Sequence, residues 1–279
     1  MPSRRLLLCT DMDRTVIPNG EAPEHPDARP RFAAFCQQQD VQLAYVTGRR
    51  PALVQKALAT YGLPAPDFAV TDVGTRIWRI EEGVWTEQEE WAREIAADWE
   101  GKTQHDLLRC LSQIPELIPQ ESDQQGRHKV SFYVSADANP EELLKQAHDL
   151  LEREGARSNL IWSVDEDREV GLLDVLPERA DKRFAVQFLA RHLQYDEEEV
   201  LFAGDSGNDL AALGSTVPAV LVANAADDVK EHAAVMAENS GCPERLYIAR
   251  GDYVGMNGNY AAGVLEGVWH FAPAFRDGL

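Results

Sequence analysis

The sequence predicts a doubly wound α/β core with a second, smaller α/β domain inserted into it. Three observations carry this prediction. Continuous apolar runs alternate with helical stretches, polar clusters follow each run, and the middle of the chain has a different pattern. Parallel strands that are buried on both faces have unbroken apolar runs. Ligands of such sheets bind beyond the carboxyl ends of the strands, so the polar clusters mark the expected site.

The apolar runs predict four strands of the core, and helical patterns lie between them. We expect these strands at 5–10, 41–46, 199–204 and 218–223. We expect helices at 28–39, 50–61, 180–194, 207–213 and 227–236. Alternation of strand and helix is typical of the α/β class and favours a parallel sheet.

The middle of the chain predicts a separate small domain. Residues 127–135 alternate between polar and apolar, which is typical of a strand with one buried face. Further strands are expected at 115–120 and 159–164, and helices at 87–100, 104–113 and 140–155. We expect this domain to cover 83–167, with the core formed by 1–82 and 168–279. Acidic stretches at 81–83 and 165–167 are the expected hinges.

Composition restricts the class of function. Acidic residues outnumber basic ones 47 to 27, which gives a net charge of −20. Nucleic-acid-binding proteins usually show the opposite balance, so we expect no nucleic-acid partner. The same field repels anions at long range, so a phosphate site must supply its own local positive charge.

No segment predicts membrane insertion or export. No apolar run is long enough for a bilayer, and the first run ends at Asp11, too early for a signal peptide. We therefore expect a cytoplasmic protein without membrane contact. The cysteines are far apart and are expected to be reduced thiols; they are Cys9, Cys36, Cys110 and Cys242.

Two carboxylates follow the first predicted strand, in the segment 11–15 (DMDRT). Phosphoryl transfer needs a nucleophile, for which a carboxylate serves, and an acid–base group for the alcohol and the water. Asp11 suits the first role and Asp13 the second. Taken alone, such a pair more often forms a turn or a helix cap.

Three further motifs add to this pair. The segment 204–210 (GDSGNDL) places Asp205, Asn208 and Asp209 at another strand end, where oxygen ligands suit magnesium. The segment 47–49 (TGR) begins a helix, and its hydroxyl and N–H groups suit phosphate oxygens. Lys182 opens a predicted helix and offers a cation that offsets developing phosphoryl charge.

In this order, the four motifs resemble those of the haloacid dehalogenase (HAD) superfamily. The resemblance implies a Rossmann-like HAD core with an inserted α/β cap, and a phosphatase that forms an aspartyl-phosphate on Asp11. It implies that Mg²⁺ is held by Asp11, the Asp13 carbonyl, Asp205 and Asp209, with Asn208 in support. It also implies that Thr47 and Lys182 bind the phosphate. The expected substrate-binding residues are Thr47, Gly48 and Arg49 of the segment 47–49, together with Asn208 and, in the cap, Lys129.

Within this superfamily the chain resembles the sucrose-phosphate phosphatases over nearly its whole length. The supporting segments include 43–50 (LAYVTGRR), 66–78 (PDFAVTDVGTRIW) and 261–271 (AAGVLEGVWHF). The resemblance implies a small-molecule sugar phosphate as substrate, with sucrose 6-phosphate first, and a sugar-phosphate synthase as a candidate partner. The sequence departs from the family pattern at three positions, which are Arg14, Asp72 and Arg183.

Several alternatives stay open from the sequence. Mannosylfructose-phosphate and glucosylglycerol- or glucosylglycerate-phosphate phosphatases share much of this pattern. A sugar phosphomutase and a non-catalytic binding protein of the same fold are further alternatives. In the cap we favour a solvated loop for Gln120, Gln124, Gln125, Arg127 and His128. We favour a core position over sugar stacking for Trp85, Trp91 and Trp99.

Overall fold

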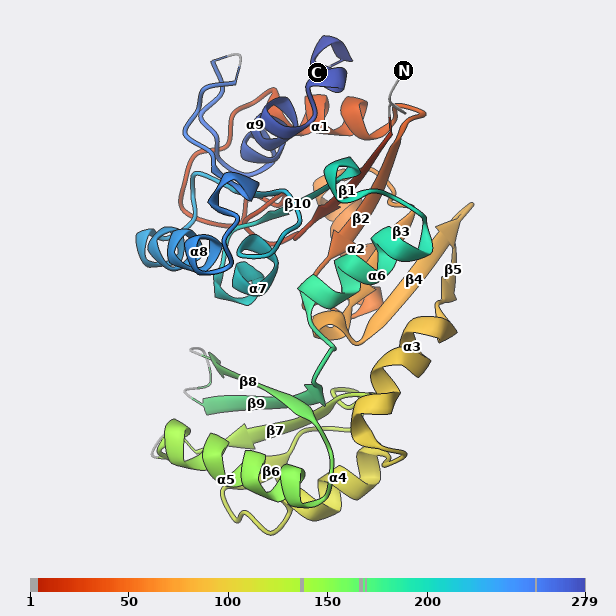
Figure 1. The fold of residues 1–279 in the computed structure, drawn as a ribbon, viewed down its shortest axis with the longest axis vertical. Helices are drawn as coiled ribbons and strands as arrows, with labels where there is room; N and C mark the ends of the chain where they lie inside the picture. Colours follow the sequence, from red (N-terminus) through yellow and green to blue (C-terminus); the bar gives the residue numbers. More distant parts are fainter. Residues whose placement is uncertain (1–4, 136–137, 166–167, 169, 254, 279) are drawn as a thin grey trace. The chain divides into compact units, whose positions relative to one another are not determined.

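The computed structural model describes residues 5–278 except 136–137, 166–167, 169 and 254. The chain divides into two compact units (Figure 1). The core unit comprises Met1–Glu87 and Lys182–Leu279, and the cap unit comprises Gln88–Asp181. Among the described residues, no helix is both long and apolar enough to cross a bilayer.

An eight-stranded sheet organises the core unit, in the order β12-β11-β10-β1-β2-β3-β4-β5. Neighbours from β12 to β3 pair in parallel, whereas the pairs β3–β4 and β4–β5 are antiparallel. The strands are β1 Leu6–Thr10, β2 Val41–Val46, β3 Phe68–Thr71, β4 Arg76–Glu81, β5 Val84–Glu87, β10 Val200–Gly204, β11 Ala219–Leu221 and β12 Leu246–Ile248. The residues of β1 and β10 are all buried, as their apolar runs predict.

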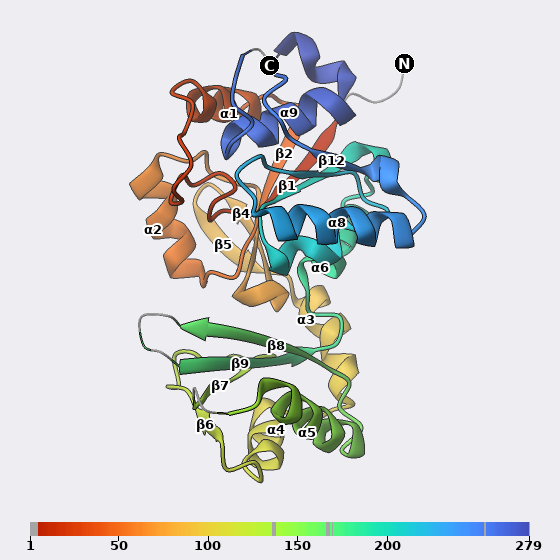
Figure 2. The same ribbon diagram turned by 90° about the vertical axis from the view of Figure 1, so that its left-hand side faces the viewer.

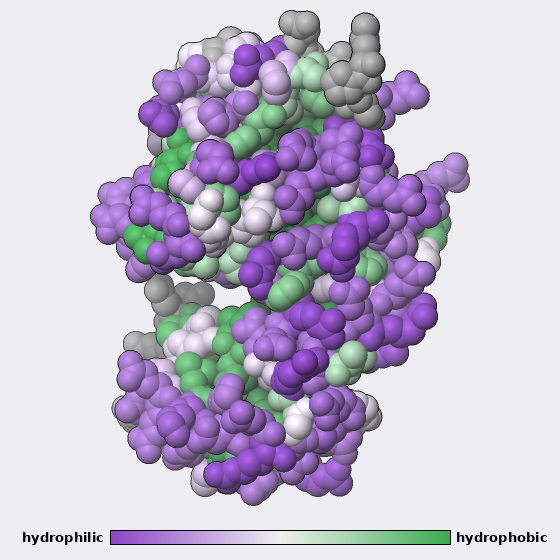
Figure 3. All heavy atoms as spheres, in the orientation of Figure 1, coloured by the Kyte–Doolittle hydropathy of each residue, from purple (hydrophilic) through white to green (hydrophobic). Residues whose placement is uncertain are grey.

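Helices cover both faces of this sheet, which confirms the predicted doubly wound α/β class (Figures 1 and 2). They are α1 Ala28–Cys36, α2 Pro51–Tyr61, α6 Lys182–His192, α7 Leu210–Leu213, α8 Asp227–Asn239 and α9 Ala261–Phe271. Leu6 and Leu8 of β1 pack with Phe32 of α1 and Val264 of α9 in one buried cluster. Hydrophilic residues cover most of the visible surface, consistent with the strongly acidic composition (Figure 3).

The cap unit is a four-stranded antiparallel sheet in the order β6-β7-β9-β8. Its strands are β6 Leu117–Pro119, β7 Val130–Val134, β8 Ser158–Asp165 and β9 Val170–Pro177, and its helices are α3 Glu89–Ala96, α4 Gln104–Leu111 and α5 Pro140–Arg153. Leu107 of α4 and Leu143 of α5 share a buried cluster with Phe132 and Leu173 of the sheet. Helices α4 and α5 therefore pack on this sheet through apolar contacts.

Short 3₁₀ turns complete the elements; they are η1 Asp72–Gly74, η2 Ala97–Trp99, η3 Glu197–Glu199, η4 Gly207–Asp209, η5 Pro243–Arg245 and η6 Pro273–Gly278. Each strand and helix expected above has a counterpart within a few residues. Strands β3, β4, β5, β9 and β12 and helix α9 were not expected as elements.

The boundaries between the units differ from the expected 82/83 and 167/168. Strand β5 pairs with β4, so residues 84–87 extend the core sheet. Strand β9 pairs with β7 and β8, so 170–177 belongs to the cap sheet. The expected hinge at 81–83 instead joins β4 to β5. Of the second expected hinge, Asp165 ends β8, and residues 166–167 lie outside the described residues.

Candidate active site

Three neighbouring strands of the core sheet deliver polar residues to one edge. Strand β1 lies between β10 and β2, and all three run parallel. The residues that directly follow them are Asp11, Asp205 and Thr47, and all three are buried. Carboxyl ends of parallel strands meet at the same edge of a sheet, so the motifs converge as the sequence predicts.

Lys182 holds the centre of this cluster. Its Nζ lies 2.9 Å from Asp11 Oδ2, 2.7 Å from Asp209 Oδ1 and 2.9 Å from Asn208 Oδ1. It is the first residue of α6, and its side chain is only 2% exposed. Burial by itself lowers the pKa of Lys182, but the charges of Asp11 and Asp209 outweigh burial and raise it above its usual value. The ammonium is therefore a fixed cation beside the nucleophile.

Asp209 supports the loop rather than presenting a free oxygen. Its Oδ2 accepts hydrogen bonds of 3.0 Å from the backbone N–H groups of Asp205 and Ser206, which closes the loop after β10. Gly204 makes this possible, because a Cβ there would lie 2.5 Å from Asp209 Cγ. The loop therefore fixes the direction in which Asp205 points.

Only one of the two carboxylate oxygens of Asp205 accepts a hydrogen bond from the described residues. Thr15 Oγ1 donates to Asp205 Oδ1 at 2.9 Å. The other oxygen, Oδ2, is buried and has no hydrogen-bond partner among the described residues. Oxygens of Asp11, Asp205 and Asp209 all lie within 4.8 Å of one another. A buried carboxylate oxygen without a donor, beside further carboxylates, fits a hard divalent cation such as Mg²⁺.

The electrostatics of the cluster agree with such a cation. Burial, followed by the charge of Asp209, raises the pKa of Asp205 to about 6. Burial also raises the pKa of Asp11 to about 7, although Lys182 opposes this. Without a further positive charge, this pocket therefore holds the pKa values of both carboxyls well above their usual range. A divalent cation would hold them ionised, as nucleophilic and ligating carboxylates must be.

Asp13 faces Arg49 in a two-pronged ion pair. Arg49 Nε donates to Asp13 Oδ2 at 2.6 Å, and Arg49 Nη2 donates to Oδ1 at 2.5 Å. Asn19 Nδ2 adds a third hydrogen bond of 2.7 Å. Burial raises the pKa of Asp13, but the hydrogen bonds and charge of Arg49 outweigh it and hold the pKa below its usual value. In this arrangement Asp13 is an ionised carboxylate.

The remaining phosphate-binding candidates lie beside this pair. Thr47 donates its N–H to the Val70 carbonyl, so only its hydroxyl remains for a phosphate oxygen. A Cβ at Gly48 would meet nothing within 4 Å, which leaves open space beside the backbone. Asp72 donates its N–H to the Arg49 carbonyl at 3.0 Å. Asp72, the first residue of the η1 turn, therefore contacts the backbone of Arg49.

That turn is conformationally strained. Asp72, Val73 and Gly74 have φ values of 52°, 60° and 94°, three successive residues in the left-handed region. For a β-branched residue such as Val73 this region is costly, by about 1–3 kcal/mol. Thr75 Oγ1 closes the turn by donating to the Asp72 carbonyl at 2.9 Å. The hydrogen bond from the Asp72 N–H to the Arg49 carbonyl connects this strained turn to the backbone of Arg49.

Sequence reasoning missed a network that holds the loop after β1. Asn224 Nδ2 donates to the Arg14 carbonyl at 2.7 Å, and Asn224 Oδ1 accepts from the Tyr260 N–H at 2.7 Å. Tyr260 OH donates to the Ala22 carbonyl at 3.0 Å. The only sequence signal was Asn224 itself, a polar residue at the end of an apolar run. Asn224, which follows β11, and Tyr260, which directly precedes α9, thus anchor the segment that carries Asp13.

In the cap unit, Lys129 belongs to a polar group on the sheet. Lys129 Nζ lies 3.2 Å from Asp174 Oδ2, and Ser131 Oγ donates to Asp174 Oδ1 at 2.5 Å. These residues come from β9 and from β7 and its entry. The group is a partly buried set of donors and acceptors, with Lys129 15% and Asp174 21% exposed.

Two expectations for the cap loop are wrong. Gln125 is half-buried, and its side-chain amide donates to the Ser131 carbonyl and accepts from the Ser131 N–H. Gln125 therefore has a structural role. His128 is buried against Trp99, with ring centroids 6.0 Å apart. The expectation of a core position is confirmed for Trp91 and Trp99, each 1% exposed. All four cysteines are free, as predicted.

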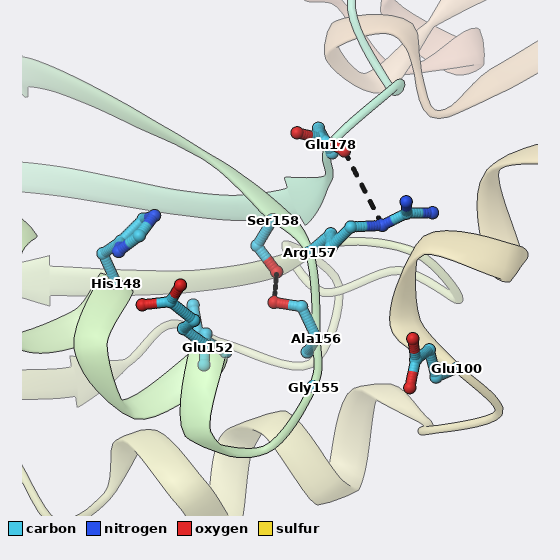
Figure 4. Close-up of a pocket in the computed structure, with 9 residues that line it drawn as sticks. Glu100, His148, Glu152, Gly155, Ala156, Arg157, Ser158 and Glu178 are labelled. Carbon is cyan, nitrogen blue, oxygen red and sulfur yellow. Dashed lines mark hydrogen bonds and ion pairs between the residues drawn. The ribbon is translucent and has the colours of Figure 1, made fainter.

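The cap unit also contains a cavity of about 300 Å³ that includes none of the predicted site residues (Figure 4). Arg157 lines it, and its guanidinium lies 2.7 Å from Asp98 and 3.7 Å from Glu178. The remaining lining residues include Glu100, His148 and Glu152. Its arginine is thus already paired with the protein's own carboxylates.

Comparison with known proteins gives a consistent result. A match to the sucrose-6F-phosphate phosphohydrolase family spans residues 4–272. A protein of Nitrosococcus oceani, described only as a HAD-like hydrolase, is 44% identical over 98% of this chain and 73% of its own length. Sucrose-phosphatase 2 of Nicotiana tabacum is 28% identical over 95% of this chain. The chain spans only 59% of that tobacco relative.

A solved structure supports the same relationship. The sucrose-phosphatase of Synechocystis sp. PCC6803, determined in complex with sucrose and phosphate, matches with a TM-score of 0.74. The two chains are 26% identical, and the match covers 96% of this chain and 98% of the other.

Proposed function

The chain belongs to the sucrose-6F-phosphate phosphohydrolase family of phosphoric monoester hydrolases, and from this we propose that it hydrolyses the phosphate ester of a small sugar, with sucrose 6-phosphate the first candidate. The observation that carries the proposal is the contact of 2.9 Å between Lys182 and Asp11, beside the unpartnered oxygen of Asp205. A buried carboxylate held by a fixed cation, next to a cation site, suits attack on phosphorus.

In the proposed reaction, Asp11 attacks phosphorus with one carboxylate oxygen, and the bond from phosphorus to the sugar oxygen breaks. Asp13 gives a proton to that oxygen, so the sugar leaves as an alcohol. Asp13 then takes a proton from water, which attacks the aspartyl-phosphate and releases phosphate and free Asp11. Lys182 stays beside Asp11 and offsets the negative charge of the transferring group.

Asp11 and Asp205 are the proposed side-chain ligands of Mg²⁺, together with the Asp13 carbonyl, while Asp209 and Asn208 hold the loop and Lys182. When bound, the ion would supply positive charge for the phosphate oxygens and keep the carboxylates ionised. Among the proposed ligand atoms, Asp205 Oδ2 fits best, because it is buried and accepts no hydrogen bond from the described residues.

Arg49 has a second part in this proposal. Asp13 serves as an acid only when it carries a proton, and its ion pair with Arg49 opposes protonation. A phosphate dianion is a stronger partner for a guanidinium than a single carboxylate is. We therefore propose that bound phosphate draws Arg49 away from Asp13, joined by the Thr47 hydroxyl and the open backbone at Gly48. Substrate binding then raises the pKa of Asp13 and readies it as the acid.

The cap unit is proposed to select the sugar. Lys129, Ser131 and Asp174 offer donors and acceptors of the kind that bind sugar hydroxyls. A sugar that binds here would replace the contact of 3.2 Å between Lys129 and Asp174 with hydrogen bonds of its own. A sugar-phosphate synthase that delivers the substrate is the proposed partner.

The test is phosphate release with Mg²⁺ from a panel of sugar phosphates. It contains sucrose 6-phosphate, mannosylfructose phosphate, glucosylglycerol phosphate, glucosylglycerate phosphate, glucose 6-phosphate and fructose 6-phosphate. We expect the highest kcat/KM with sucrose 6-phosphate, and no turnover by Asp11→Asn. The matched control is Asp40→Asn, which changes an exposed aspartate and should retain full activity. Preference for another member would move the substrate within the family, and activity in Asp11→Asn would reject the covalent mechanism.

A further inference from the structure

The cluster around Asp205 contains a second cation, Arg14, that the proposed reaction does not use. Arg14 Nε lies 3.5 Å from Asp205 Oδ2, the oxygen that has no hydrogen bond. Arg14 is also one of the three positions at which the sequence departs from the pattern of the family that it resembles. The Arg14 guanidinium therefore lies beside the same oxygen, Asp205 Oδ2, that is proposed to bind the metal.

The backbone of Arg14 is fixed, so only its side chain can move. Its N–H donates to Asn19 Oδ1 at 2.8 Å, and its carbonyl accepts from Asn224 Nδ2 at 2.7 Å. Its φ of 56° lies in the left-handed region, which such side-chain hydrogen bonds help to hold. The base of the side chain is therefore positioned beside Asp205 irrespective of what the pocket contains.

The two partners of this contact differ in burial. The Asp205 side chain is 2% exposed, whereas that of Arg14 is 50% exposed. A half-exposed guanidinium can turn into water at little cost, because its charge stays hydrated there. Asp205 has no such freedom, since Thr15 Oγ1 fixes its other oxygen at 2.9 Å. The carboxylate thus stays in place while its cation can be exchanged.

We propose that Arg14 is a built-in competitor of the metal. In the metal-free protein its guanidinium neutralises Asp205, and the divalent cation takes Oδ2 by displacing it. The inference rests on the proposed function, because it assumes that this cluster binds a divalent cation. It adds that this chain binds the cation more weakly than the carboxylates alone would, since like charges repel at this distance.

The test measures metal binding directly, by titrating metal-free protein with Mn²⁺ and following free Mn²⁺ by electron paramagnetic resonance. Arg14→Gln should bind Mn²⁺ about fivefold more tightly than the wild type, an order of magnitude expected for a partly screened charge. Arg14→Lys keeps the charge and should stay near the wild-type affinity. The control Lys56→Gln removes an exposed charge from α2 and should leave the affinity unchanged.

A second measurement separates competition from simple loss of structure. In EDTA, Arg14→Gln should unfold at a lower temperature than the wild type, because Asp205 loses its cation. Saturating Mg²⁺ should remove this difference. The affinity gap should also narrow in high salt, where charge repulsion is screened.

Equal or weaker Mn²⁺ binding by Arg14→Gln would overturn the proposal. The premise is tested by the wild type and by Asp205→Asn, which should lose most of its Mn²⁺ affinity. Absence of Mn²⁺ binding by the wild type would reject the metal site itself, and the competitor with it. A normal metal site that is indifferent to Arg14 would reject the competitor alone.

Discussion

Replacement of Lys182 by methionine tests the central contact of the site. The Nζ lies within 2.9 Å of three oxygens, and the side chains of Asp11 and Asp209 are only 7% and 0% exposed. Lys182→Met keeps most of the apolar stem but leaves two buried carboxylates without their cation. Breaking a buried ion pair in this way costs about 3–5 kcal/mol. We expect that loss in the free energy of unfolding at pH 7.

The assay is urea unfolding in EDTA, compared with the control Lys145→Met. Lys145 pairs with Asp149 at 2.9 Å but is 76% exposed, so its removal should cost at most about 0.5 kcal/mol. Lowering the pH to 5 should reduce the loss in Lys182→Met, because the unpaired carboxylates then accept protons. A loss equal to that of the control would refute the reasoning that this ion pair is buried and stabilising.

Three other outcomes are expected. In EDTA, the stability of Asp205→Asn relative to the wild type should rise between pH 4 and pH 6. Burial raises the folded pKa of Asp205 to about 6, above the unfolded value of about 3.9, so the wild type loses stability as pH rises through this window; thermal unfolding at several pH values tests this, and a flat difference would contradict it. Asn224→Ala removes the donor to the Arg14 carbonyl and should lower kcat while leaving the melting temperature nearly unchanged. Steady-state kinetics and calorimetry measure the two quantities, and a clear fall in melting temperature with an unchanged kcat would show that the role is structural only. Glu266→Ala should lower the free energy of unfolding by about 3 kcal/mol, because this 1% exposed carboxylate accepts three hydrogen bonds near 2.9 Å from β12 and the residues that follow it; chemical denaturation measures this loss, and a loss under 1 kcal/mol would show that these donors find other partners.

The sequence predicted the central strands of the core sheet from their apolar runs. Strands β1, β2 and β10 are almost entirely apolar because both faces of the sheet are covered, and this pattern can be recognised without knowing which strands are their neighbours. Strand β4, by contrast, has the sequence RIWRIE and pairs antiparallel between β3 and β5. Its charged residues obscure the strand signal, since it is only half-buried.

Strand β9 was missed as a cap strand for a packing reason. Gly171 lies against Trp162 of β8, so close that a Cβ would lie 2.3 Å from the indole ring. Glycine is a poor strand former in sequence patterns, although here it makes room for the tryptophan. The acidic residues near 165–167 then suggested a domain boundary between two strands that in fact pair antiparallel in the cap sheet.

The predicted catalytic residues converge because strand ends do, but their pairing depends on side-chain geometry. The order of motifs predicted that Lys182 offsets the acidic cluster, and the structure shows it paired with Asp11 and Asp209. No sequence pattern indicated that Arg49 would bind Asp13, which lies 36 residues away. Such contacts depend on the direction of each side chain at the sheet edge, which residue spacing alone does not determine.

The strand order has a consequence for how the chain is synthesised. Strand β1 is synthesised early, but one of its two neighbours, β10, is synthesised only near residue 200. The hydrogen bond between Thr15 and Asp205 likewise joins residues that are 190 positions apart. The core sheet therefore closes late, with a large loss of chain entropy. The cap unit is one continuous stretch, Gln88–Asp181, whose strands can pair as soon as it emerges. A truncated chain ending before residue 200 would thus retain a cap able to fold, beside an N-terminal half whose hydrophobic strand edge invites aggregation.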